Sequence, residues 1–301
     1  IMTWWERRLL GFWQDRLGPN RLGLFGIGQV AADMLKLLFK DDWVPPFSDK
    51  VVFIFAPTAI VVAMMMGFAV VPFAPKTYIL DVNIGLLFFL GMTSLAVYSV
   101  LLGGLASNNK YALLGGLRSA AQMVSYEVFM GLSLMGIVMM TGSFSLVDIV
   151  EAQTEVWFCF SQVLGLFVFI VSGVAESHRL PFDLPEAEHE LTAGFHTEYG
   201  GMKFAMFMLG EYLGLVLISC MIVTLFFGGW MVPAIIYEWL PPFIWFSLKV
   251  FLVICFFVLL RAAIPRPRYD QLMSLGWKVM LPITLINLLV TGALLLYMKG
   301  S

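Results

Sequence analysis

Acidic residues and histidines are concentrated in one stretch of this chain, between Glu176 and Glu198. Six of the twenty Asp and Glu residues and all three histidines lie there, between two long apolar segments. Carboxylates next to a membrane are costly to bury and typically mark ion pathways or proton relays. Burial also raises the pKa of a carboxyl group towards the range in which it exchanges protons. We therefore expect residues 176–199 to form an acidic functional loop.

The composition defines the class of protein that must hold this loop. The chain is 60% apolar and 13% charged, with a mean hydropathy of +0.89. Soluble domains are about 45–50% apolar and about 25% charged. The sequence therefore predicts an integral membrane protein, and its net charge of −2 does not suggest a nucleic-acid partner.

Seven apolar stretches are long enough to cross a membrane, which takes about 20 helical residues. Their continuous apolar character favours helices over the alternating pattern of a membrane barrel. The chain also begins at Ile1 rather than Met and soon reaches Glu6, which predicts that an earlier span is truncated. We expect a single all-α transmembrane domain over residues 1–301, with spans at about 51–71, 84–105, 119–140, 157–175, 204–229, 243–260 and 279–298.

The distribution of Lys and Arg predicts how these spans are oriented. Fifteen of the eighteen basic residues lie on one side of the membrane in this arrangement of spans. Lys76 and Lys299 lie on the other side, and Lys249 lies inside a span. Basic loops face the cytoplasm, so the acidic loop is predicted to be cytoplasmic as well.

Near the start of the chain, residues 22–40 are too polar to cross the membrane. Their polar side chains follow one stripe, which predicts an amphipathic helix at the membrane interface or packed on the bundle.

Two further carboxylates are predicted inside the membrane. Glu127 and Glu211 lie nine and eight positions into their spans from the nearest basic residue, so each is roughly 12–14 Å deep along the helix axis. Each is expected to face the bundle interior or a water-filled cavity, as a proton relay or as a structural hydrogen-bond acceptor.

No metal-ligand spacing or cofactor motif is visible in the sequence, and Cys159, Cys220 and Cys255 lie in apolar spans. No redox centre is therefore predicted in this chain.

Four long strings resemble the H subunit of bacterial respiratory complex I, the family of mitochondrial subunit 1. They are WWERRLLGFWQDRLGPNRLG, ASNNKYALLGGLRSAAQMVSYE, AESHRLPFDLPEAEHELTAGFHTEYGGMKFAMFMLGEY and RPRYDQLMSLGWK. The resemblance covers nearly the whole chain and implies eight spans, in agreement with seven visible ones and a truncated first. One departure is His178, because many members read ETNR where this chain reads ESHR.

The resemblance implies a subunit of NADH:quinone oxidoreductase, a translocase, that forms part of the quinone chamber and couples quinone reduction to proton translocation. It implies quinone, ubiquinone in type, as the substrate, with flavin and iron-sulfur clusters only in the peripheral-arm partner subunits. It also implies the other membrane-arm subunits and membrane lipid as partners. The implied location is the bacterial inner membrane, with the mitochondrial inner membrane as the alternative. The implied quinone-binding residues are Arg21, Asp33, Arg179, Asp183 and Phe195, and the implied coupling carboxylates are Glu6, Glu127, Glu176, Glu186, Glu188, Glu190, Glu198 and Glu211.

Two alternatives remain open at this stage. One is the homologous membrane subunit of an energy-converting hydrogenase or formate hydrogenlyase, which needs no quinone. The other is a stand-alone ion transporter, against which the two halves of the chain show no internal repeat.

Overall fold

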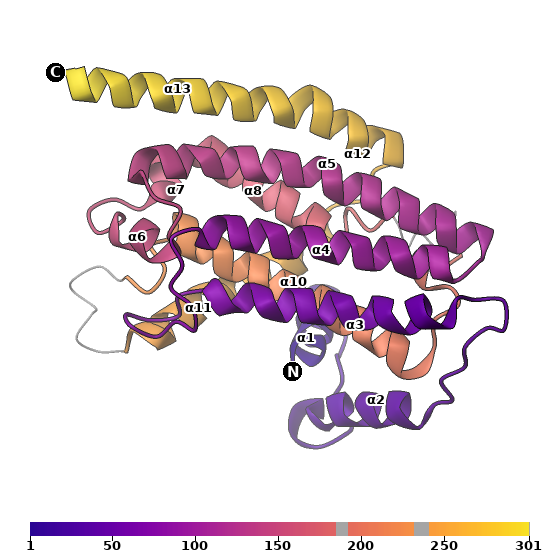
Figure 1. The fold of residues 1–301 in the computed structure, drawn as a ribbon. Coiled ribbons are helices and arrows are strands. Elements are labelled where there is room, and N and C mark those ends of the chain that lie inside the picture. Colours follow the sequence, from indigo (N-terminus) through magenta and orange to yellow (C-terminus); the bar gives the residue numbers. More distant parts are fainter. Residues whose placement is uncertain (185–191, 232–240, 301) are drawn as a thin grey trace.

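The computed structural model describes residues 1–184, 192–231 and 241–300, and these ranges contain helices and no strand (Figure 1). Six helical segments are long and apolar enough to cross a membrane, and a shorter apolar helix accompanies them. The expected all-α membrane architecture is thereby confirmed. The helices are α1 (Met2–Trp13), α2 (Gly28–Phe39), α3 (Lys50–Gly67), α4 (Gly85–Ala106), α5 (Lys110–Thr141), α6 (Leu146–Glu151), α7 (Phe158–Ser161), α8 (Val163–Glu176), α10 (Gly201–Phe226), α11 (Pro242–Ala263), α12 (Tyr269–Leu275) and α13 (Leu281–Gly300).

The long helices pack side by side in a layered bundle. Helix α4 lies between α3 and α5, α10 packs on α3, and α13 lies along α5 at the edge of the molecule (Figure 1). Large aromatic side chains fill the centre, among them Phe53, Phe89, Phe169 and Phe207, each fully buried. The burial of this apolar surface holds α10 against the other spans and fixes the start of α10, where the acidic loop ends.

The stretch predicted as one span at 157–175 is broken in the structure. Helix α7 ends at Ser161, Gln162 adopts a non-helical conformation, and α8 begins at Val163. The Gln162 side chain donates a hydrogen bond from Nε2 to Thr291 Oγ1 at 2.9 Å and accepts one from Asn287 Nδ2 at 2.8 Å. A polar residue inside an apolar stretch thus breaks the helix where it finds partners on α13.

Helices α1 and α2 are adjacent and lie outside the main layers. Arg7 of α1 pairs with Asp33 of α2 at 2.9 Å, while Met34, Leu35 and Leu38 on α2 are exposed. Asp33 in the polar stripe therefore faces α1, while apolar side chains of α2 are exposed, as in a helix that contacts lipid. Its position at the membrane interface stays a prediction.

Lys249, the one lysine predicted inside a span, is stabilised by hydrogen bonds to backbone carbonyl groups. Its Nζ donates hydrogen bonds to the carbonyl oxygens of Phe227, Gly229 and Met231 at 2.7, 3.1 and 2.7 Å, and it lies over the ring of Trp157. These carbonyls follow the end of α10, where helix carbonyls lack partners within the helix. The lysine therefore joins α11 to the end of α10.

Candidate functional site

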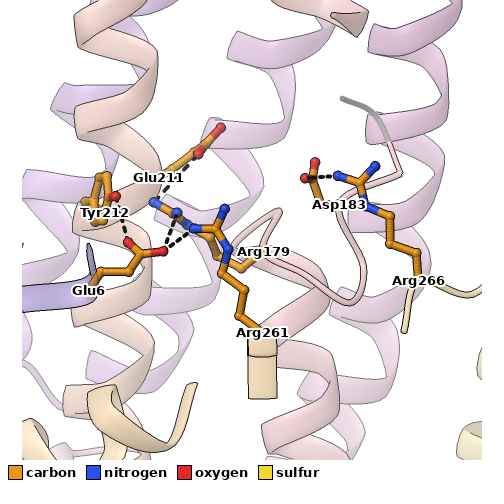
Figure 2. A network of polar contacts seen from close by, with 7 residues as sticks. All are labelled: Glu6, Arg179, Asp183, Glu211, Tyr212, Arg261 and Arg266. Atoms are coloured by element: carbon orange, nitrogen blue, oxygen red, sulfur yellow. Dashed lines mark hydrogen bonds and ion pairs between the residues drawn. The ribbon is translucent and has the colours of Figure 1, made fainter. Parts of the chain in front are cut away.

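A buried cluster of acidic and basic side chains joins four segments that are far apart in sequence (Figure 2). Glu6 of α1 accepts a hydrogen bond from the Tyr212 hydroxyl at 2.7 Å and forms an ion pair with Arg261 of α11. The Arg179 guanidinium, from the loop after α8, lies 3.5 Å from Glu6 and 4.0 Å from Glu211 of α10. It also lies 4.0 Å above the centre of the Tyr212 ring. Among the residues that the structure describes, the cluster holds two carboxylates and two guanidiniums, whose charges balance.

The electrostatics of the cluster favour its charged form. Burial disfavours the ionised carboxylate of Glu6, but the guanidiniums of Arg179 and Arg261 and the Tyr212 hydroxyl outweigh it and hold the pKa of Glu6 below its ordinary value. Burial likewise opposes the charge of Arg179, while Glu211 and Glu6 outweigh it and raise the pKa of Arg179. Arg179 is therefore a permanent cation shared between two carboxylates.

Close packing of the backbone positions this loop. A Cβ atom at Gly115 of α5 would lie only 2.7 Å from the Gly194 Cα atom and from the Phe195 nitrogen, so only glycine lets the two segments meet there. Phe195 is 1% exposed and packs edge to face on Phe207 of α10. The predicted quinone residue Phe195 is thus a buried side chain that anchors the loop to two spans.

Asp183 and Arg266 form a second ion pair beside the cluster, at 2.6 Å (Figure 2). Asp183 lies only four residues after Arg179, yet it faces the segment that follows α11. Asp33 accepts hydrogen bonds from Arg7 and from Gln29 on the outer helices. Arg21 is exposed in the connection between α1 and α2. The implied quinone residues Asp33, Arg179 and Asp183 therefore lie in three separate polar groups.

The implied coupling carboxylates outside the cluster have separate surroundings. Glu127 of α5 accepts a hydrogen bond from Ser94 of α4. Glu176, the last residue of α8, is 1% exposed, and neither of its carboxyl oxygens has a hydrogen-bond partner among the described residues, although the charge of Glu127 acts on it. Glu198 accepts a hydrogen bond from Asn109 at 2.7 Å. The other three implied coupling residues, Glu186, Glu188 and Glu190, lie outside the described residues.

Two histidines of the same loop, His178 and His196, are neutral. His178 is buried with its Nε2 3.2 Å from the Ser119 hydroxyl, and burial together with the charges of His196 and Arg179 lowers the pKa of His178 to about 4. Burial lowers the pKa of His196 to about 4 as well. At neutral pH these side chains therefore act as dipoles, and within the described ranges no group of three metal-ligating side chains forms.

Sequence reasoning missed several partners in this region. Tyr212 and Arg261 complete the cluster, Arg266 holds Asp183, and Ser94 binds Glu127. Tyr212 directly follows Glu211, which was a usable signal. The others lie on elements that only the packing brings near.

The fold and the cluster together define a multi-pass α-helical membrane protein that buries paired acids and arginines where several spans end. A family model described as NADH dehydrogenase matches residues 1–292. The NADH-quinone oxidoreductase H subunit of Methylococcus capsulatus is 62% identical over 292 residues, which are 97% of this chain and 91% of that protein. The chain belongs to the NADH dehydrogenase family of membrane subunits, the family of the complex I H subunit, as its motifs predicted.

Proposed function

We propose that this chain is the membrane subunit of a proton-translocating NADH:quinone oxidoreductase and that it forms part of the quinone chamber. The electrons that reduce the quinone then come from flavin and iron-sulfur clusters in the peripheral-arm partner subunits. The chain lies in the bacterial inner membrane. The high identity to a subunit named for NADH and quinone supports this proposal over a hydrogenase or a stand-alone transporter. Ubiquinone is the quinone that we expect.

The observation that carries the coupling proposal is the position of Arg179 between two buried carboxylates. Its guanidinium is 3.5 Å from Glu6 and 4.0 Å from Glu211, and these carboxylates belong to different helices. A cation that two acids share responds to any nearby change of charge by favouring one acid over the other. The acid that loses the cation then becomes easier to protonate.

Quinone reduction supplies such a change, because its two electrons bring negative charge into the chamber and the two compensating protons are withdrawn from neighbouring acids. A unit charge 10 Å away at an effective dielectric constant of about 20 changes the energy of a carboxylate by about 1.7 kcal/mol. That corresponds to a little over one pKa unit. This energy is thus large enough to move a proton between two acids of similar pKa. Movement of the loop that carries Arg179 supplies the rest of the coupling between quinone reduction and proton translocation.

The carboxylates beyond the cluster provide the next steps of the proposed relay. Glu176 is buried without a hydrogen-bond partner in the described part of the chain, and the charge of Glu127, which accepts a hydrogen bond from Ser94, acts on it. Glu198 and the undescribed Glu186, Glu188 and Glu190 belong to the same loop, and we assign them to the same relay. We further propose that Asp33, Asp183, Arg21 and Phe195 line or support the quinone path.

Replacing Arg179 by alanine tests this function directly. We expect Arg179→Ala to reduce NADH:quinone activity by at least about tenfold, because Glu211 and Glu6 then no longer share a cation and Glu6 keeps only its pair with Arg261. NADH oxidation by a hydrophilic artificial acceptor should stay unchanged, since that assay reads only the peripheral arm.

Arg16→Gln is the matched control, because Arg16 is exposed and lies outside the cluster. Both activities of the control should equal those of the unmodified complex. If Arg179→Ala lowers both activities together, the residue supports assembly rather than quinone reduction, and the proposal fails.

A further inference from the structure

A pocket lies where α2 meets the start of α10, away from the ion-pair cluster. Its volume is about 510 Å³, and it is lined by Lys36, Leu37 and Lys40 of α2 and by Tyr199, Gly200, Gly201 and Phe204. Phe204 belongs to the first turn of a helix that is long and apolar enough to cross a membrane. The pocket therefore lies where that span leaves the membrane, on the side that is rich in Lys and Arg and is predicted to be cytoplasmic.

The charge in the pocket is unbalanced. Lys36 and Lys40 are exposed, and neither has a carboxylate within ion-pair distance in the part of the chain that the structure describes. The nearby Lys203 differs, because it pairs with Asp42 at 2.7 Å and leaves that acid neutralised. No acid is among the residues that line the pocket, against two lysines, although Asp41 and Glu198 adjoin lining residues in the sequence. The wall is thus positive and favours an anion.

Tight backbone packing forms the pocket before any ligand arrives. Gly201 has a φ of +52°, and a Cβ atom there would lie 3.2 Å from the Lys40 carbonyl oxygen. This close approach holds the end of α2 against the start of α10. At Gly200, in contrast, a Cβ atom would meet nothing within 4 Å, so the space beside it is open.

Apolar side chains next to the lysines indicate that the anion carries a tail. Leu35, Leu38 and Phe39 of α2 are 53%, 55% and 86% exposed, and Met202 of α10 is 40% exposed. A free phosphate would leave this surface in water, whereas the acyl chains of a lipid would cover it. Basic pockets between membrane helices on this side are suited to anionic headgroups.

We propose that this pocket binds the headgroup of an anionic phospholipid, with Lys36 and Lys40 on the phosphate and the acyl chains along the exposed side of α2. The site does not depend on the proposed function, because none of its residues belongs to the ion-pair cluster. It gives α2, which packs on α1 and α10, a lipid contact at its C-terminal end.

The test uses the purified complex in nanodiscs that contain phosphatidylglycerol with a photoreactive acyl chain, followed by peptide mapping. We expect crosslinks to α2 and to the first turn of α10. Unlabelled phosphatidylglycerol should compete, while phosphatidylcholine with the same tails and inorganic phosphate should not. Competition by inorganic phosphate alone would identify a phosphate site and overturn the lipid assignment, and equal competition by phosphatidylcholine would overturn the role of charge.

Two kinds of variant separate charge from shape. Lys36→Gln and Lys40→Gln should each weaken labelling by about fivefold, and the double variant by about thirtyfold, from the typical effect of one lysine near an anionic surface. Gly200→Leu keeps both lysines but fills the pocket without strain, because Gly200 has an extended backbone with φ −132°, and it should also abolish labelling.

Lys50→Gln is the control for general attraction to the surface, because Lys50 is exposed at the start of α3 and does not line the pocket. Its labelling should equal that of the unmodified chain. An equal loss in Lys50→Gln, or full labelling in Gly200→Leu, would refute the pocket. The competition experiment on the unmodified complex decides the question even if a variant fails to assemble.

Discussion

Replacing Glu6 by glutamine removes one charge from the buried cluster and keeps the shape of the side chain. The amide oxygen still accepts the hydrogen bond from Tyr212, so the loss is electrostatic. The two arginines differ in exposure: the Arg179 side chain is 13% exposed and that of Arg261 is 36% exposed. Breaking a buried pair costs about 3–5 kcal/mol, whereas exposed pairs contribute about 0.2–1 kcal/mol. Since Arg179 retains Glu211, we expect Glu6 to contribute about 3 kcal/mol through Arg179 and about 1 kcal/mol through Arg261.

A double-mutant cycle measures these two contributions separately. Glu6→Gln is combined with Arg179→Gln and with Arg261→Gln, and the free energy of unfolding is followed by the helical circular dichroism signal during titration with SDS in mixed micelles. The coupling of Glu6 to Arg179 should exceed that to Arg261, although Arg261 makes the closer contact. Equal couplings, or a larger one for Arg261, would refute the argument from burial.

The same variant has a predictable dependence on pH. The pKa of Glu6 is lowered from its ordinary value of 4.5 in the folded chain. Its contribution to stability is therefore present above pH 4.5 and is lost as the pH falls through the lower, folded pKa. The difference in stability between the unmodified chain and Glu6→Gln should be full at neutral pH and shrink in acid. A difference that stays constant on acidification would mean that the charge of Glu6 does not stabilise the fold.

Two further predictions concern the interior of the bundle. Glu127→Gln and Glu211→Gln should each leave the complex assembled but sharply reduce proton-coupled quinone reductase activity, because an amide cannot titrate, whereas Asp should retain part of it; normal turnover and a normal proton gradient in both Gln variants would reject them as relays. Gln162→Leu and Asn287→Leu should each lower the free energy of unfolding by about 1–3 kcal/mol, because each leaves a buried partner unsatisfied. The double variant should cost less than the sum, and strict additivity in the SDS titration would mean that the two side chains do not act as a pair.

The membrane class, most of the spans and the family were predictable from the sequence alone. A membrane span depends on about 20 consecutive residues, so it can be recognised locally from composition. The charged residues could also be recognised as candidates, because a carboxylate in or beside a membrane is costly wherever it lies. The long motifs that carry the family resemblance are likewise continuous in sequence.

The pairing of the charges was decided only by tertiary structure. Arg179 is four residues from Asp183, yet its partners are Glu6 and Glu211, while Asp183 pairs with Arg266. Which acid meets which arginine depends on how helices from distant parts of the chain pack, and no local pattern contains that information. The break at Gln162 has the same origin, because its hydrogen-bond partners lie more than a hundred residues away on α13. Sequence therefore determines which groups need a partner, and packing determines which partner each one receives.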